Sequence, residues 1–471
     1  MRSLPNDVLL LVGEQIDQQM DRWNLLFVSH HFHDLFLPLL YRTVPLKNWN
    51  DAKSFLLAVR KRRQLARVVQ KLDLIGWRSK RISNDEKVEL QCSAALHEWL
   101  DIVSYSNKEK RDWARDLAKG LGDAWIALLL PLLNQLRQLH LVYGTDTPYL
   151  NRIMQQAISG ERPFDTYPPF RCLREVTLNR RDDFDLPDHR NPTGEEPRSS
   201  ASLLLPFFQL PSVRTITADS VIDPSLDIGP ESQPRTGRSP MGLSSITEID
   251  LRASNANYGM EVLVASCADL KSFKYQHSDS HVCSHGYQPS ALYRSLAPSK
   301  ASLQTLWLDH HGSHYPFTAL GLNQTHDEWF GSLVDFTVLR EVRIRLPNLL
   351  DIRYSNEPTT PLIDCLPSSL EAIYIEGCEE RHVPMLVRQL QAVIKNRRTR
   401  APRLQQIDIE GGFQNAPSED SGHTDVLPST ALEGTVKEKI LQAAEPLHLG
   451  CIDAGIDLHV HDRALAQGPP L

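Results

Sequence analysis

Histidine and cysteine side chains gather in one short segment, where imidazole and thiolate groups could bind a metal ion. His277, His281, Cys283 and His285 all lie within this stretch. They are proper zinc ligands, but their spacing fits no standard structural zinc site and no second ligand pair lies near. The alternative is a polar loop that follows a strand. We therefore expect no metal and no cofactor, while the sequence leaves zinc binding at this segment open.

Other clusters of reactive or charged side chains have simpler explanations as polar surface. Arg60-Lys61-Arg62-Arg63 could be a nuclear signal or a phosphate contact, but a charged helix face is the simpler interpretation. No G-x-x-x-x-G-K loop, G-x-S-x-G elbow or H-E-x-x-H pair occurs, so no nucleophile or base can be named. We expect no enzyme, with a cryptic site in the loops as the alternative. Two further histidine groups also have simple interpretations. His310, His311 and His314 are interpreted as a loop after a strand, and His30, His31 and His33 as a solvated helix end.

Composition and charge narrow the class of protein. At 471 residues, 41% of them hydrophobic, the chain exceeds one ordinary core, so several domains or a repeat array are expected. The net charge of −7 argues against a general nucleic-acid binder, which needs a basic surface. Seven scattered cysteines favour reduced thiols, and the apolar stretch at residues 124–133 is too short to cross a bilayer. With a poor signal peptide, we expect a soluble cytoplasmic or nuclear protein without membrane or nucleic-acid partners.

Residues 1–46 have the pattern of three short helices. Pro5 suits the first position of a helix, and Asp7 favours its first turn. Asp21 can cap a second helix, and Pro38 interrupts or kinks a third. Apolar residues recur through all three segments at helical spacing. Because so small a unit cannot bury all of them, a partner is expected to cover the remainder.

The motifs in this segment resemble an F-box. They are Leu4-Pro-x-Asp-Val-Leu, Leu25-Leu26-x-Val28-Ser29, Phe32-x-x-Leu35 and Leu39-Leu40-Tyr41, with Asp7, Ser29 and Phe32 where the family more often has Glu, Cys and Trp. The resemblance implies docking onto a Skp-family adaptor, which joins the cullin scaffold of an SCF ubiquitin ligase. The alternative is an ordinary helical cap on a repeat array. The residues that the pattern assigns to adaptor binding are Leu4, Pro5, Val8, Leu9, Leu25, Leu26 and Leu39.

A hexad of the form aliphatic-x-x-aliphatic-x-aliphatic recurs along the rest of the chain. Its second half alternates apolar and polar residues, as a strand with one buried face requires. So many copies in order cannot be chance, and they resemble leucine-rich repeats, which place one parallel strand per repeat on the inner wall of a horseshoe. The copies begin at Leu136, Leu173, Val213, Ile246, Leu270, Leu303, Leu339, Leu370 and Leu404, with flanking candidates at Val69 and Ile456.

The predicted fold is therefore α/β, with an F-box followed by an irregular leucine-rich-repeat solenoid. We predict the F-box at residues 1–46, a helical linker with a first degenerate repeat at 47–135, and the solenoid at 136–471. Helices are expected near residues 84–105 and 108–130, with Trp99, Trp113 and Trp125 as packing residues. Segments rich in proline and charge predict flexible insertions near residues 182–200, 223–241 and 414–430.

Polar residues that alternate with the aliphatics should face a binding partner. Trp307, Tyr374, Arg343 and Arg345 are of the types that dominate interface energetics, although Trp307 could instead pack against a neighbouring strand. We predict a non-catalytic substrate-recognition adaptor of an SCF-type ligase, binding an unknown target protein. The alternative is a repeat-based interaction scaffold that assembles no ligase. The predicted substrate-binding residues are Lys274, Trp307, Asp309, Arg343, Arg345, Tyr374, Glu376 and Asp408.

Overall fold

The computed structural model divides the chain into two compact units. The first comprises residues 1–219 and 243–246, and the second comprises residues 220–242 and 247–471. The predicted domain bounds at residues 46 and 135 stay predictions. The structure describes residues 4–74, 94–142, 147–179, 199–223, 242–278, 287–310, 327–413 and 436–462, apart from residues 17, 167 and 356.

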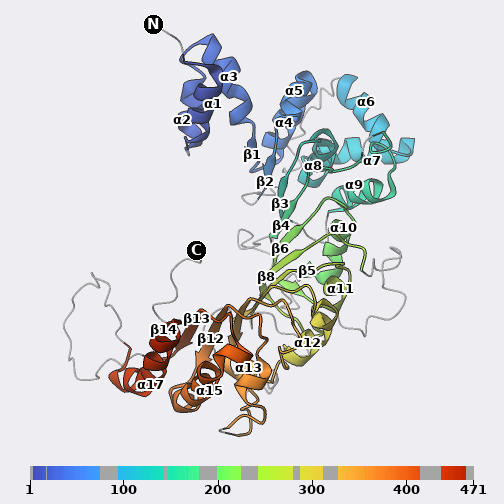
Figure 1. The fold of residues 1–471 in the computed structure, drawn as a ribbon. Helices are drawn as coiled ribbons and strands as arrows, with labels where there is room; N and C mark the ends of the chain where they lie inside the picture. The colour runs from blue at the N-terminus through green and yellow to red at the C-terminus, as the bar shows by residue number, and fades with distance from the viewer. Residues whose placement is uncertain are drawn as a thin grey trace, which may run out of the picture. The chain divides into compact units, whose positions relative to one another are not determined.

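Three helices open the first unit, as the sequence predicted: α1 (Asn6–Glu14), α2 (Gln19–Leu25) and α3 (His30–Leu40) (Figure 1). The predicted cap at Asp21 is wrong, because α2 begins at Gln19 and Asp21 lies within its first turn. Pro5 precedes α1, and the Ser29 hydroxyl caps α3 by accepting the Phe32 N–H at 3.1 Å. Pro38 lies inside α3. A Cβ on Gly13 would stand 2.5 Å from the Phe36 ring, so this glycine lets α1 and α3 approach closely.

The first unit continues with parallel strands that pair in chain order, from β1 through β2, β3 and β4 to β6. Strand β1 was not predicted; it is only three residues long and buries Val44 alone. The strands are β1 (Thr43–Pro45), β2 (Lys71–Asp73), β3 (Gln138–Val142), β4 (Glu175–Asn179), β5 (Ser199–Ser200) and β6 (Thr215–Asp219). The helices after α3 are α4 (Trp49–Lys61), α5 (Arg63–Ala66), α6 (Ala94–Val103), α7 (Asn107–Ala118), α8 (Gly122–Leu129), η1 (Leu130–Leu132), α9 (Pro148–Ser159), η3 (Ala201–Leu204) and α10 (Leu205–Phe208).

The helical stretch before β3 differs in detail from the prediction. The helix expected at residues 108–130 is divided into α7 and α8, because Gly120 adopts a left-handed backbone (φ 68°) between them. Of the helix expected at 84–105, the residues up to 93 lie outside the described ones, and α6 forms the remainder. Trp99, Trp113 and Trp125 are at most 7% exposed, so they are core residues as predicted.

The second unit repeats the same architecture. Strands β8 to β14 pair in parallel and in chain order. The strands are β7 (Val221–Ile222), β8 (Glu248–Ser254), β9 (Ser272–His277), β10 (Thr305–His310), β11 (Glu341–Arg345), β12 (Ala372–Cys378), β13 (Gln406–Gly411) and β14 (Asp457–Asp462). The helices are α11 (Glu261–Val264), α12 (Pro289–Leu296), η4 (Ala297–Ser299), α13 (Leu346–Leu349), α14 (Leu362–Cys365), η6 (Glu380–His382), α15 (Val383–Lys395), α16 (Arg397–Arg400) and α17 (Glu438–Ala454).

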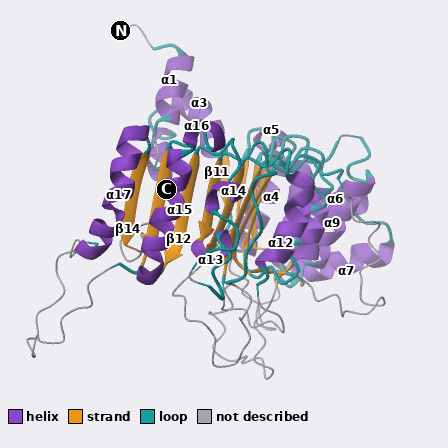
Figure 2. Cartoon of the chain, turned by 60° about the horizontal axis from the view of Figure 1, so that its bottom comes forward, coloured by secondary structure: helices purple, strands orange, loops and turns teal. Residues whose placement is uncertain are grey.

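Every predicted hexad forms one of these strands, and the hexad aliphatics set the register. Leu306, Val342, Ile373 and Ile407 are in line across β10 to β13 and are at most 1% exposed. Helices α15 and α17 pack against each other beside β12–β14 (Figure 2). A parallel sheet with one aliphatic face against helices leaves the alternating residues of each strand on the other face.

The three predicted insertions lie almost wholly outside the described residues, which resume at residues 199, 242 and 436. Among the described residues, no helix is both long enough and apolar enough to cross a membrane.

Candidate functional site

A row of polar and aromatic residues crosses strands β9 to β14, one residue from each strand. Parallel pairing places Trp307 beside Lys274 on one side and beside Arg343 on the other. The same register continues from Arg343 to Tyr374 and from there to Asp408 and His459. We call Lys274, Trp307, Arg343, Tyr374, Asp408 and His459 the polar row. It lies on the sheet face opposite the hexad aliphatics.

Cations and aromatic rings alternate in the first part of the polar row. The Lys274 ammonium lies 3.7 Å from the centre of the Trp307 ring, and the Arg343 guanidinium lies 4.5 Å from the centre of the Tyr374 ring. Both distances fall within the range of a cation–π interaction. The Trp307 indole also donates to Glu341 Oε1 at 3.1 Å. The neighbouring strands therefore hold both rings in place. Trp307 packs against side chains of the adjacent strands, which was the alternative to a freely exposed ring.

Arg343 stands between two carboxylates on adjacent strands. Its Nη2 atom is 3.3 Å from Asp309 Oδ2 and 3.3 Å from Glu376 Oε2. Glu376 is only 3% exposed. Burial, followed by repulsion from Asp309, holds the pKa of Glu376 well above its usual range, although Arg343 opposes that shift. One guanidinium cannot fully neutralise both acids, so Glu376 binds a proton more readily than an ordinary carboxylate does.

Strands β12 to β14 contribute a second hydrogen-bonded group. Asp408 Oδ1 lies 3.1 Å from His459 Nδ1 and 3.1 Å from His461 Nε2, while Gln406 donates to Asp408 Oδ2 at 2.7 Å. The Tyr374 ring stacks on His461 with centroids 6.4 Å apart. The Tyr374 hydroxyl donates to Glu410, and burial together with this bond raises the pKa of the tyrosine.

The comparison with known families decides the class of this array. Residues 191–417 match the family model of the leucine-rich repeat domain. The match includes strands β6 to β13 and most of the polar row, so the leucine-rich-repeat prediction is confirmed for this segment. Leucine-rich repeats are typically non-catalytic modules that bind other proteins. No curated protein is significantly similar in sequence to the chain.

The leucine-rich-repeat strands bring the predicted substrate-binding residues together, but these residues differ in solvent exposure. Lys274, Trp307 and Tyr374 are partly exposed on the sheet face. Three others are nearly buried and offer little surface to a partner protein; they are Arg345 at 7%, Glu376 at 3% and Asp408 at 6% exposed. His459 and His461 were not predicted as participants, although the alternation of His459, Val460 and His461 was a usable signal.

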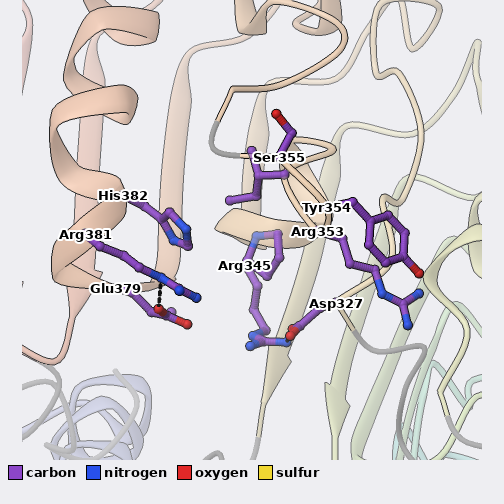
Figure 3. Close-up of a pocket in the computed structure, with 11 residues that line it drawn as sticks. Asp327, Arg345, Arg353, Tyr354, Ser355, Glu379, Arg381 and His382 are labelled. Atoms are coloured by element: carbon purple, nitrogen blue, oxygen red, sulfur yellow. Dashed lines mark hydrogen bonds and ion pairs between the residues drawn. The ribbon is translucent and has the colours of Figure 1, made fainter.

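Arg345 follows the alternation of β11 but is nearly buried, and it lines a pocket. It pairs with Asp327 at 2.8 Å. Arg381 and Glu379, which also line this cavity of about 310 Å³, pair with each other at 2.6 Å (Figure 3). Burial lowers the pKa of His382 on the same wall, so this imidazole tends to be neutral. The pocket lining therefore carries both signs of charge, with three arginines (Arg345, Arg353 and Arg381) and two acids (Asp327 and Glu379).

The residues predicted to bind an adaptor lie on the three N-terminal helices or, for Leu4 and Pro5, directly before α1. Leu4 is 58% exposed, Val8 is 40% exposed, and Leu11 and Val12 beside them are 61% and 56% exposed. Pro5 is exposed, and Leu9, Leu25 and Leu39 are partly exposed. Leu26 is 6% exposed, so it supports the helices from inside. Of the histidine clusters, His30, His31 and His33 begin α3, whereas His281, Cys283, His285, His311 and His314 lie outside the described residues.

Proposed function

We propose that this chain is the non-catalytic substrate-recognition subunit of an SCF-type ubiquitin ligase in the cytoplasm or nucleus. Its N-terminal helices bind a Skp-family adaptor, which joins the cullin, and its leucine-rich repeats bind the target protein. The observation that carries the recognition half is the polar row on consecutive parallel strands. The ligase gains rate by proximity, because a bound target has a high effective concentration near the conjugating enzyme.

The docking half rests on the apolar surface of α1. Leu4, Val8, Leu11 and Val12 are each at least 40% exposed on a unit of three short helices. A contiguous apolar patch of this kind marks an interaction site on a soluble protein. The F-box resemblance of the same residues indicates which partner covers it. Truncating a leucine that the adaptor buries costs about 2–5 kcal/mol, enough to weaken docking by well over tenfold.

The recognition half rests on residue types and on order. Trp307, Tyr374 and Arg343 belong to the types that contribute most of the free energy at interfaces. Their contacts with Lys274, Glu341 and Glu376 hold them in one conformation. Because cations precede Tyr374 in the polar row and Asp408 follows it, the face suits a target that carries both signs of charge.

The docking test replaces Leu4 and Pro5 by alanine and measures which proteins co-purify with the chain. We expect the Skp-family adaptor and the cullin to be lost, while the repeats stay folded. Leu449→Ala is the matched control, since Leu449 on α17 is 57% exposed and Leu4 is 58% exposed. If the wild-type chain recovers neither adaptor nor cullin, the chain is a scaffold that assembles no ligase. If Leu4→Ala with Pro5→Ala recovers both unchanged, docking lies elsewhere.

The recognition test replaces Lys274 and Trp307 by alanine. We expect captured targets to fall at least tenfold, as for a hot spot worth more than about 1.4 kcal/mol, while the adaptor is retained. Arg343→Glu is unsuitable, because it would add a third acid beside Asp309 and Glu376. Tyr354→Ala, at a side chain that is 86% exposed outside the polar row, is the control. Unchanged capture by the double variant would place recognition on another surface.

A further inference from the structure

We propose that Asp408, His459 and His461 form a binding site for a divalent transition-metal ion, with zinc the best match to these ligands. The proposal does not depend on ligase function. Among the described residues, these three side chains can each offer one ligand atom, and the three atoms lie within 4.8 Å of one another. Two imidazoles and one carboxylate form a donor set that zinc and its neighbours in the transition series prefer.

The fold of strands β13 and β14 creates the set. Parallel pairing places Asp408 directly beside His459. His461 follows two residues later on β14, so its side chain lies on the same face of the sheet. All three ligands therefore come from regular backbone, which holds their separations more firmly than a loop would.

The separations match a metal coordination sphere. Asp408 Oδ1 is 3.1 Å from His459 Nδ1 and 3.1 Å from His461 Nε2. Ligands about 2.0–2.2 Å from zinc in tetrahedral geometry are roughly 3.4 Å apart. The two oxygen–nitrogen separations therefore need to grow by only a few tenths of an ångström, and the two imidazole nitrogens lie within 4.8 Å of each other. Without an ion, the same spacing is that of hydrogen bonds from two imidazole N–H groups to one carboxylate oxygen.

The surrounding side chains orient the ligands as a metal site requires. Gln406 donates to Asp408 Oδ2 at 2.7 Å, which leaves Oδ1 directed at the two histidines. Tyr374 stacks on the His461 ring at an interplanar angle of 11°. Such outer contacts fix the ligands and raise metal affinity. The His459 and His461 side chains are 50% and 42% exposed, so water can reach the site and fill a fourth position.

The ion would join the last strand to its neighbour. Strand β14 is the outermost strand of its sheet and pairs only with β13 among the described strands. A metal bound by Asp408 on β13 and by both histidines on β14 therefore stabilises this pairing. Its open position faces the same side as the rest of the polar row, where a target's own histidine, cysteine or carboxylate could complete the coordination.

The test adds Zn²⁺, and separately Co²⁺, to the metal-stripped full-length chain. We expect one ion per chain by equilibrium dialysis, Co²⁺ absorption bands in the visible range, and a higher unfolding temperature with Zn²⁺. His459→Ala with His461→Ala should weaken Zn²⁺ binding more than 100-fold, and Gln406→Ala should weaken it roughly 10-fold through loss of the outer contact.

His448→Ala is the matched control, because this exposed histidine lies on α17, outside the set. Asp408→Asn serves as the second ligand variant, since it keeps the side-chain shape if the histidine pair proves necessary for folding. Failure of the wild-type chain to bind Zn²⁺ would overturn the proposal. So would binding that survives in both ligand variants, or that is lost instead in Cys283→Ser with His285→Ala.

Discussion

Replacing Arg343 by methionine should lower the free energy of unfolding, because it removes the positive charge beside the buried carboxyl group of Glu376. The side chain of Glu376 is 4% exposed, whereas that of Arg343 is 28% exposed. At 3.3 Å and an effective dielectric constant of about 20, the attraction between the two charges is roughly 5 kcal/mol before desolvation is counted. Breaking a buried pair from one side typically costs about 3–5 kcal/mol, because it leaves the other charge uncompensated.

The loss should depend on pH, since Glu376 can escape the penalty by binding a proton. Its pKa in the folded chain is already well above the usual range, mainly through burial. A carboxyl with a raised folded-state pKa stabilises the fold fully below its unfolded pKa of about 4.3, and that contribution is lost as pH rises through the folded pKa. Removing Arg343 raises the folded pKa further. Arg343→Met should therefore lower the free energy of unfolding by about 3–5 kcal/mol at pH 8 and by clearly less at pH 5.

Urea unfolding followed by tryptophan fluorescence at both pH values measures this difference. Glu376→Gln, added to Arg343→Met, should restore most of the stability at pH 8. Arg252→Met is the control, because Arg252 pairs with Asp250 at 2.9 Å but is 59% exposed, and such surface pairs contribute at most about 1 kcal/mol. An equal loss at both pH values, or no recovery with Glu376→Gln, would refute the reasoning.

Two further predictions concern stability elsewhere in the chain. Gly411→Ala should lower the free energy of unfolding by about 1–3 kcal/mol, because the added Cβ would stand 2.2 Å from the Cys378 carbonyl oxygen. Gly412→Ala is the control: a Cβ there would meet nothing within 4 Å, so the free energy of unfolding in the same urea assay should hardly change. Asp123 accepts the Tyr149 and Leu150 N–H groups at 2.7 and 3.0 Å, and burial raises the pKa of its carboxyl to about 7. Its contribution to stability should fall as pH rises from about 4 towards 7, so Asp123→Asn should flatten the unfolding temperature over this range; parallel curves for the two proteins would contradict the assignment.

The strands could be predicted from the sequence because each hexad carries its own signal. The aliphatics of Leu303-Gln-Thr-Leu306-Trp-Leu308 alternate with polar residues, and the alternation specifies which face is buried within a single repeat. Parallel pairing then puts equivalent positions in line, which is why Lys274, Trp307 and Arg343 could be grouped from the repeat pattern alone. Strand β1 has only Val44 to bury, and so it left no pattern.

The exposure and partners of the site residues could not be predicted in the same way. Arg345 follows the alternation of its strand, yet α13 begins at Leu346, and Arg345 pairs with Asp327 instead of facing a partner. Asp408 is 51 residues from His459 in the chain, so nothing local connects the two. The pattern of a repeat specifies register, whereas ion pairs and ligand sets depend on which repeats become neighbours and on how long the intervening segments are.

The mutual contacts within the polar row bear on the entropy of recognition. Lys274 covers Trp307, Arg343 covers Tyr374, and Tyr374 stacks on His461, so these side chains have already lost much of their rotamer freedom in the unbound chain. Ordering a flexible side chain on binding costs about 0.5–1.5 kcal/mol, and a surface ordered beforehand avoids that loss. Association should then resemble the docking of rigid bodies. A substitution at one position would loosen its neighbours and shorten the lifetime of the complex more than it slows encounter.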